Sequence, residues 1–159
     1  MTRNVFPTGP SPQVEAVALV RDVEGAVLMV AADKRGWTLP GAWVRAGESV
    51  AEAAERGLRQ ETGLTRRLRH VLAVDHTFGD DTTASFTLVC DAGTLTADEA
   101  AKVALPDDAP AALVAVTWVP PQRLREYVLA HQAGRISEAV HAVRTGRGLR
   151  LLVRGRRVS

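Results

Sequence analysis

The stretch of the chain that decides the fold is residues 41–64, which reads GAWVRAGESVAEAAERGLRQETGL. Ser49 and Glu52 have the spacing of a capping box, in which each side chain bonds the other residue's backbone amide at a helix start. Gly63 is placed to end the helix, because glycine adopts the left-handed conformation of a helix C-terminus without steric cost. The stretch therefore predicts a helix over 50–62 that follows a loop.

One face of this predicted helix carries a carboxylate. At one hundred degrees per residue, the shared face consists of Val50, Ala53, Ala54, Gly57, Leu58 and Glu61. All but Glu61 are small or apolar, and a charge that faces protein is costly unless it is paired or binds a cation. A salt bridge to an arginine such as Arg56, or a helix end that frays into water, would also satisfy Glu61. Helix geometry alone leaves its role open.

The loop and the helix together resemble the Nudix box of the Nudix hydrolase family. That pattern is Gly, five residues, Glu, seven residues, then Arg-Glu-aliphatic-any-Glu-Glu-any-Gly-aliphatic. The matching positions are Glu48, Arg56, Leu58, Glu61, Gly63 and Leu64. The departures are Ala42 for the first glycine, Gly57 for the glutamate after the arginine, and Gln60 for the first of the paired glutamates. The resemblance implies an α/β protein, a Nudix-type α/β/α sandwich with a mixed β-sheet.

The resemblance also implies an activity, the hydrolysis of a nucleoside diphosphate linked to another moiety, with Mg²⁺ or Mn²⁺ as cofactor. Carboxylates on one helix face hold a hard cation, which neutralises phosphate oxygens and helps to generate the attacking water. Carried onto this chain, Glu61 is the principal metal ligand and Gly41, Glu48 and Gln60 are the further ligands. Glu48 and Arg56 support Glu61 in catalysis.

The departures weaken the expected metal site, because positions 57, 60 and 61 keep one negative charge of three. Two unit charges about 4 Å apart interact by about 4 kcal/mol at an effective dielectric constant of 20, so the loss is large. A loop aspartate is a possible replacement, although turn residues are the commoner role of such groups. The candidates are Asp80, Asp81, Asp107 and Asp108.

Two alternatives to hydrolysis remain open at this point. One is a non-catalytic Nudix-fold protein that binds a nucleotide or a protein partner, which the missing carboxylates favour. The other is a pocket that serves a biosynthetic reaction without cleavage of a diphosphate. If the chain is a hydrolase, the sequence does not distinguish among three substrate classes, which are sugar nucleotides, damaged nucleotides and isoprenoid-type diphosphates.

Three residues near the box are candidates for binding the substrate. Arg35 and Arg45 flank the expected site, and arginine grips phosphate in a bidentate fork. Trp43, in the box loop, is placed to stack on a base or to cover the pocket. Exposed arginines and a tryptophan packed on the core are the commoner roles of such residues.

The rest of the chain reads as alternating strands and helices. Apolar runs predict a hairpin of strands at 14–20 and 26–31, and a short extended piece at 37–41. Strands are expected at 68–77, 82–90, 114–119 and 149–153, and helices at 122–132 and 136–144. The segment 1–12 contains four prolines or glycines and is expected to be a flexible arm, which leaves 13–159 as a single Nudix domain.

Composition sets the outer limits. The chain has 159 residues, of which 46% are hydrophobic, and a formal net charge of +2. No apolar run is long enough to span a membrane and no secretory signal is recognisable, so we expect a cytoplasmic protein without a membrane partner. Cys90 is the only cysteine, so any metal must be held by oxygen or nitrogen. A small-molecule diphosphate is the expected partner, a homodimer is left open, and the arginines after position 143 are expected to be a solvated basic tail rather than a nucleic-acid contact.

Overall fold

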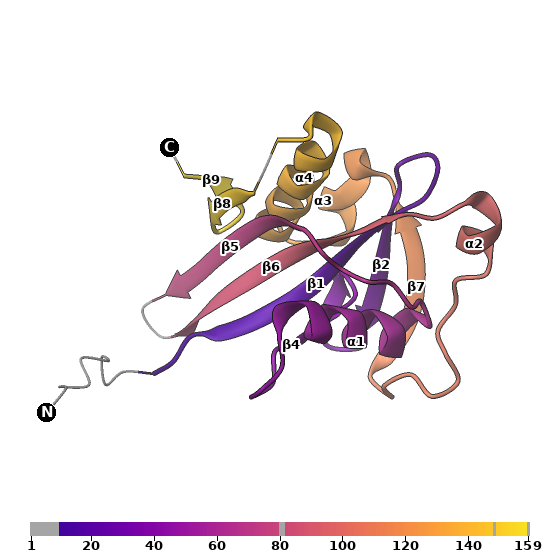
Figure 1. Ribbon diagram of the computed structural model, residues 1–159, viewed down its shortest axis with the longest axis horizontal. Helices are drawn as coiled ribbons and strands as arrows, with labels where there is room; N and C mark the ends of the chain where they lie inside the picture. Colours follow the sequence, from indigo (N-terminus) through magenta and orange to yellow (C-terminus); the bar gives the residue numbers. More distant parts are fainter. Residues whose placement is uncertain (1–9, 80–81, 148, 159) are drawn as a thin grey trace, which may run out of the picture.

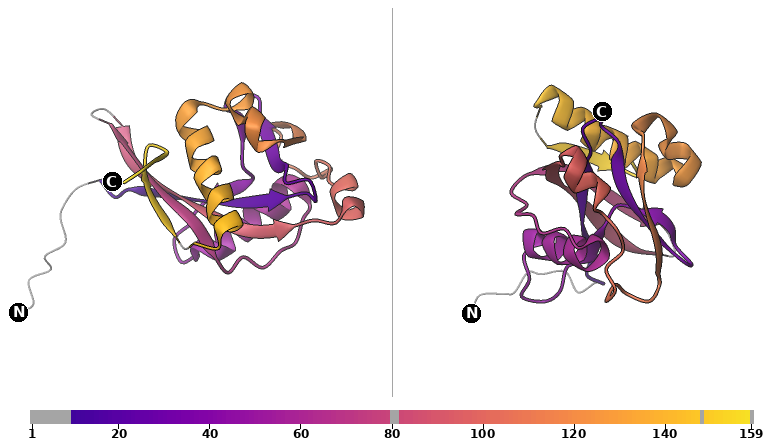
Figure 2. Two further views of the ribbon diagram at one scale, coloured as in Figure 1. Left: turned by 90° about the horizontal axis from the view of Figure 1, so that it is seen from above. Right: turned by 90° about the vertical axis from the view of Figure 1, so that its right-hand side faces the viewer.

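Helices lie on both faces of a mixed β-sheet in the computed structural model, which describes residues 10–79, 82–147 and 149–158 (Figures 1 and 2). The expected α/β/α sandwich is confirmed. Most of the arm expected at 1–12 lies outside the described residues.

The strands are β1 (Gln13–Arg21), β2 (Val27–Ala32), β3 (Gly36–Thr38), β4 (Gly41–Trp43), β5 (Val71–Gly79), β6 (Thr82–Thr94), β7 (Leu113–Val119), β8 (Arg150–Val153) and β9 (Arg156–Arg157). The main path of the sheet runs β3-β2-β1-β6-β5-β8-β9, with β4 paired to β1 and β7 paired to β2. The pairs β1–β6 and β5–β8 are parallel and the others are antiparallel. The sheet is therefore mixed, and β9 is a strand that the sequence did not predict.

The helical elements are α1 (Val50–Thr62), α2 (Ala97–Ala101), the 3-10 turn η1 (Pro121–Arg123), α3 (Leu124–Tyr127) and α4 (Ala130–Thr145). The predicted helices at 122–132 and 136–144 are wrong in their bounds, because one helix runs unbroken through Gly134 and Arg135. A Cβ atom on Gly134 would lie 2.5 Å from the carbonyl oxygen of Gly155. Glycine at this position allows α4 to contact the β8–β9 turn and does not mark a break between helices.

Strand β1 is apolar over residues 16–20 because both of its faces are packed. Ala16 and Ala18 face the layer that contains α1, whereas Val17 and Leu19 face the layer that contains α4. Both faces of this central strand are buried, so it lacks the alternation of apolar and polar residues that a strand with one wet face shows.

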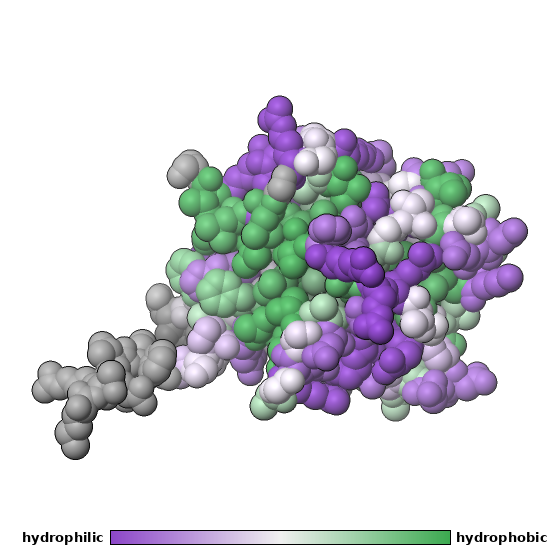
Figure 3. All heavy atoms as spheres, viewed as in Figure 1, coloured by the Kyte–Doolittle hydropathy of each residue, from purple (hydrophilic) through white to green (hydrophobic). Residues whose placement is uncertain are grey.

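Helix α1 covers only part of its face of the sheet. Beside it, over β5, β6 and β8, apolar side chains gather on the surface (Figure 3). Phe78, Leu149 and Leu151 are each about half exposed in this region. None of the helices in the described ranges has the length and apolar character that crossing a membrane requires.

Candidate functional site

The candidate site is built on α1, whose ends are where the sequence predicts them. The backbone amide of Glu52 donates to Ser49 Oγ at 3.1 Å, and the amide of Ser49 donates to Glu52 Oε2 at 2.7 Å. Gly63 ends the helix with a φ of 74°. These caps fix which residues face the sheet, and they place Glu61 on the side of the helix that faces β4.

Two glycines bring the backbones of α1, β4 and β1 into direct contact. A Cβ atom on Gly57 would lie 2.6 Å from the Cα of Gly41 and closer still to the Gly41 carbonyl group. A Cβ atom on Gly41 would lie 2.7 Å from the Cα of Val17 and closer still to the carbonyl oxygen of Ala16. Gly57 is unfavourable for a helix by itself, and this contact explains its presence.

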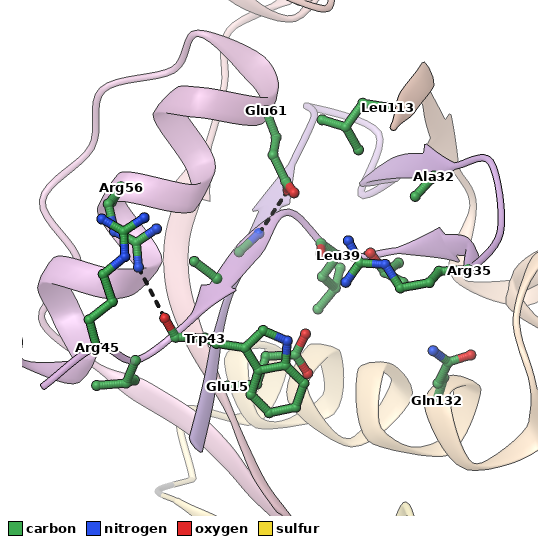
Figure 4. Close-up of a pocket in the computed structure, with 14 residues that line it drawn as sticks. Glu15, Ala32, Arg35, Leu39, Trp43, Arg45, Arg56, Glu61, Leu113 and Gln132 are labelled. Carbon is green, nitrogen blue, oxygen red and sulfur yellow. Dashed lines mark hydrogen bonds between the residues drawn. The ribbon is translucent and has the colours of Figure 1, made fainter. Parts of the chain in front are cut away.

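Glu61 projects from α1 toward the pocket, where its Oε2 accepts a hydrogen bond of 3.0 Å from the backbone amide of Gly41 (Figure 4). Burial raises the pKa of Glu61 to about 7, while the Gly41 amide and Arg35 act in the opposite direction and Glu15 adds to the increase. None of the ion pairs among the described residues includes Glu61. Helix α1 continues past Glu61 to Thr62, and the salt bridge to Arg56 that would also have satisfied Glu61 does not form.

Arg56 pairs with Glu48 instead. Its Nε donates to Glu48 Oε1 at 2.7 Å and its Nη2 to Glu48 Oε2 at 3.0 Å, a bidentate contact. Oε2 also accepts from the backbone amide of Arg45, and Arg56 Nη2 donates to the carbonyl oxygen of Trp43 at 3.0 Å. The hydrogen bond from Arg56, helped by the Arg45 amide, lowers the pKa of Glu48 to about 2. The pair fastens the box loop to α1.

A pocket of about 540 Å³ opens beside Glu61, a size that suits a small-molecule ligand. Six of the eight residues proposed from the sequence line it, and these are Arg35, Gly41, Trp43, Arg45, Arg56 and Glu61. Glu48 lines the adjoining hollow behind Arg56, and Gln60 is exposed and lines neither. Most of the residues proposed from the sequence therefore line one pocket.

Glu15 is a pocket residue that the sequence analysis missed. It projects from β1 and accepts a hydrogen bond of 3.3 Å from the hydroxyl of Thr87 on β6. The signal for it was present, because Glu15 is the only charged residue in the apolar run 14–20. Gln132, from the first turn of α4, is a second lining residue that was not predicted.

Carboxylates are scarce around the pocket. In the part of the chain that the structure describes, no group of three or more histidine, cysteine, aspartate or glutamate side chains is placed to hold a metal ion. Asp107 and Asp108 are exposed and do not line the pocket, and Asp80 and Asp81 lie outside the described residues. Glu61 and Glu15 are the carboxylates that line the pocket wall.

Comparison with known proteins identifies the family. The sequence profile of the NUDIX domain matches residues 11–140. The chain belongs to the Nudix family. No relative among curated proteins matches it.

Solved structures with the same fold are distant in sequence. A NUDIX hydrolase from Nitrosomonas europaea superposes with a TM-score of 0.69 at 14% identity, over 91% of this chain and 80% of that one. The NUDIX domain of Shewanella oneidensis NrtR, complexed with ADP ribose, gives a TM-score of 0.68 at 18% identity, over 88% and 94%. The MutT protein of Methanosarcina mazei Go1 gives 0.66 at 20% identity, over 88% and 99%. At these identities the likeness establishes the Nudix fold alone.

The three departures from the Nudix box have different structural settings. Ala42 lies in β4, paired with Ala16, and lines the pocket. Gly57 is buried against Gly41, whereas Gln60 points to solvent. Of the positions that carry glutamate in the Nudix helix, only Glu61 brings a carboxylate to the pocket.

Proposed function

We propose that this chain is a divalent-cation-dependent Nudix hydrolase that cleaves a nucleoside diphosphate linked to another moiety. The observation that carries the proposal is Glu61, a partly buried carboxylate on the pocket wall that takes part in no ion pair among the described residues. A desolvated carboxylate is a candidate functional group, because a bound cation would offset the cost of its burial. The ADP ribose in the Shewanella oneidensis domain supports a nucleoside diphosphate ligand.

The donors present fit a loosely held Mg²⁺ or Mn²⁺. Mg²⁺ commonly takes one or two carboxylates and fills its other positions with water and substrate phosphates. Glu61 would hold the cation, with the Gly41 carbonyl oxygen as a further ligand. Both oxygens of Glu48 already accept hydrogen bonds, so Glu48 supports the site through Arg56, and Gln60 is exposed and takes no part in the proposed site. When bound, the cation supplies neutralisation of the diphosphate and activation of water.

The chain's own groups bind and orient the substrate. Arg35 and Arg45 both line the pocket and lie on opposite sides of the view in Figure 4, where Arg45 runs beside Arg56. Neither forms an ion pair within the described residues. Both are available to phosphate oxygens, which guanidinium groups bind through paired N–H donors. Trp43 is 44% exposed and offers a face on which a planar ring can stack. Arg56 holds the loop that carries Trp43 and Arg45.

The test is hydrolysis by the wild-type protein and two matched variants. Nucleoside diphosphate sugars, oxidised nucleotides and isoprenoid diphosphates are incubated with each protein and Mg²⁺ or Mn²⁺, and phosphate or nucleotide release is measured. We expect Glu61→Gln to lose turnover and Glu24→Gln, at an exposed site in the β1–β2 turn, to keep it. No turnover by the wild type above Glu61→Gln on any compound would overturn the proposal.

A second candidate, a non-catalytic nucleotide-binding protein, is favoured by one observation. The backbone contact between Gly57 and Gly41 occupies the place where the family's first helix glutamate would project. Under this alternative, nucleotide binding measured by calorimetry would survive both chelation of divalent cations and Glu61→Ala, and no compound in the panel would be cleaved.

A further inference from the structure

The register of the sheet places two pocket side chains, Glu15 and Trp43, in one row with the buried Thr87. Glu15 is the cross-strand partner of Trp43 on β4 and also of Thr87 on β6. Directly paired residues point to the same face of a sheet, with Cβ atoms of antiparallel partners about 4.5–5.5 Å apart. Trp43, Glu15 and Thr87 therefore lie side by side on one face of the sheet, and Figure 4 shows the indole ring beside the Glu15 carboxylate.

Glu15 is held in place and has an oxygen to spare. Thr87 is buried, with 3% of its surface exposed, and its hydroxyl donates to Glu15 Oε2 at 3.3 Å. Oε1 has no hydrogen-bond partner among the described residues, and Glu15 lines the pocket. A carboxylate accepts hydrogen bonds and donates none, so Oε1 selects for a ligand group that donates.

We propose that Glu15 is a specificity-determining residue, which selects a nucleotide whose base stacks on Trp43 and presents two adjacent N–H donors to the carboxylate. The proposal rests on the proposed function, because it takes the pocket to bind a nucleotide. It adds the position of the base and the chemistry by which that base is chosen.

Guanine is the base that matches this arrangement. Its ring N–H and its amino group lie next to each other on one edge, so both can donate to a carboxylate. Adenine and cytosine each set one amino donor beside a ring nitrogen that accepts, and uracil sets its ring N–H between two acceptor oxygens. Each of those edges would bring an acceptor against Glu15, and an acceptor that loses water without gaining a donor weakens binding.

A cationic ligand group fits the pocket less well than a planar base. Recognition of a cation by aromatic faces improves when several rings surround it. Trp43 is the sole aromatic residue among the pocket residues that the structure describes, so it provides one flat platform rather than a cage. Arg35 and Arg45 line the same pocket and add positive charge, which favours an anionic nucleotide over a cation.

The experiment measures the affinity of the intact protein for α,β-methylene analogues of GDP and ADP, which resist hydrolysis, by isothermal titration calorimetry. Wild type is expected to bind the guanine analogue about 10- to 100-fold more tightly, the range for hydrogen bonds to a charged group. Glu15→Gln keeps an acceptor for Thr87 but places an amide donor in the row, and should bring the ratio close to one. Glu24→Gln makes the same chemical change outside the pocket and should leave the ratio unchanged.

Trp43→Ala separates stacking from hydrogen bonding. Loss of the stacking surface is expected to weaken both analogues by about 5- to 100-fold while the guanine-to-adenine ratio persists. The 2′-deoxy form of the guanine analogue should bind to wild type as well as the ribose form, because the proposal assigns Glu15 to the base and not to a ribose hydroxyl.

Four results would overturn the proposal. Equal binding of both analogues to wild type would refute the role of Glu15 and leave the proposed function standing. A preference that survives Glu15→Gln, or one that falls with removal of the 2′-hydroxyl, would assign recognition to other atoms. If no nucleotide analogue binds with or without Mg²⁺, the proposed function fails and the inference fails with it.

Discussion

Replacement of Gly57 by alanine is the most direct test of how α1 packs on the sheet. At an exposed position inside a helix, this change would stabilise the protein by about 1 kcal/mol, because alanine is the better helix former. At Gly57 the added methyl group would meet the Gly41 backbone, with its Cβ 2.6 Å from the Gly41 Cα. The two effects have opposite signs, and the structure decides which is larger.

The steric effect should be the larger one. Overpacking a tight interior costs about 1–3 kcal/mol, and the upper part of that range applies where the neighbour is backbone and cannot rotate away. Gly41 is itself pressed against Val17 and Ala16 of β1, so it has little room to retreat. Subtraction of the gain in helix propensity leaves a net loss of about 1–2 kcal/mol in the free energy of unfolding.

The measurement is urea denaturation followed by circular dichroism, together with a thermal scan. For a domain of this size the loss corresponds to a decrease in Tm of about 2–8 °C. Gln60→Ala is the control, since Gln60 is exposed on the same helix and its replacement should change stability by less than about 0.5 kcal/mol. A Gly57→Ala protein as stable as wild type, or more stable, would show that α1 does not rest on the Gly41 peptide.

Four further predictions follow from the charged groups. Asp75 is fully buried and its Oδ2 lies 2.7 Å from Arg135 Nε, so Asp75→Asn should lower the free energy of unfolding by about 3–5 kcal/mol; an unchanged urea midpoint would contradict this. The pKa of Glu61 is raised from 4.5 to about 7, so its contribution to the stability of the cation-free protein is complete below pH 4.5 and is lost as the pH rises through 7. For the same reason, Mg²⁺ binding to Glu61 at pH 7 should release about half a proton, and equal calorimetric enthalpies in buffers of different ionisation enthalpy would refute that. The pKa of Glu48 is lowered from 4.5 to about 2 by Arg56, so the stability that this pair contributes is present above pH 4.5 and is lost as the pH falls toward 2. The acid unfolding of Glu48→Gln should therefore show a shallower pH dependence over that range than the unfolding of wild type.

Local features of the sequence predicted α1 and its neighbourhood well. Ser49, Glu52 and Gly63 define the helix ends through interactions within a few residues, so no knowledge of the rest of the fold was needed. The same holds for the apolar strands, whose residues are chosen for burial on both faces of a sheet. Because the box loop is short and fastened to α1 by Arg56, Trp43 and Arg45 line the same pocket as Glu61.

Features that depend on contacts between distant segments were not predictable in this way. Gly134 and Gly57 both weaken a helix as isolated residues, and only the backbone of Gly155 or Gly41 shows why each is tolerated. Glu15 lies 46 residues before Glu61, and the pairing of β1 with β4 brings them to one pocket. The packing of the sheet determines which strands pair and in which register. A single charged residue in an apolar run therefore marks an unusual position but does not show which residues lie beside it.

The contact between Gly57 and Gly41 bears on the function as well as on stability. A glutamate at position 57 would restore the family pattern, but its Cβ would occupy the space now filled by the Gly41 peptide. Gly57→Glu should therefore disturb the loop that carries Arg45 and Trp43 before it can add a metal ligand. The close packing fixes Gly41 where its amide meets Glu61. In the proposed hydrolase, Glu61 would then be the one helix carboxylate available to a cation. A site with one helix carboxylate must rely on the substrate's phosphates to complete the coordination, so metal affinity should be weak in the free protein and increase when a diphosphate is bound.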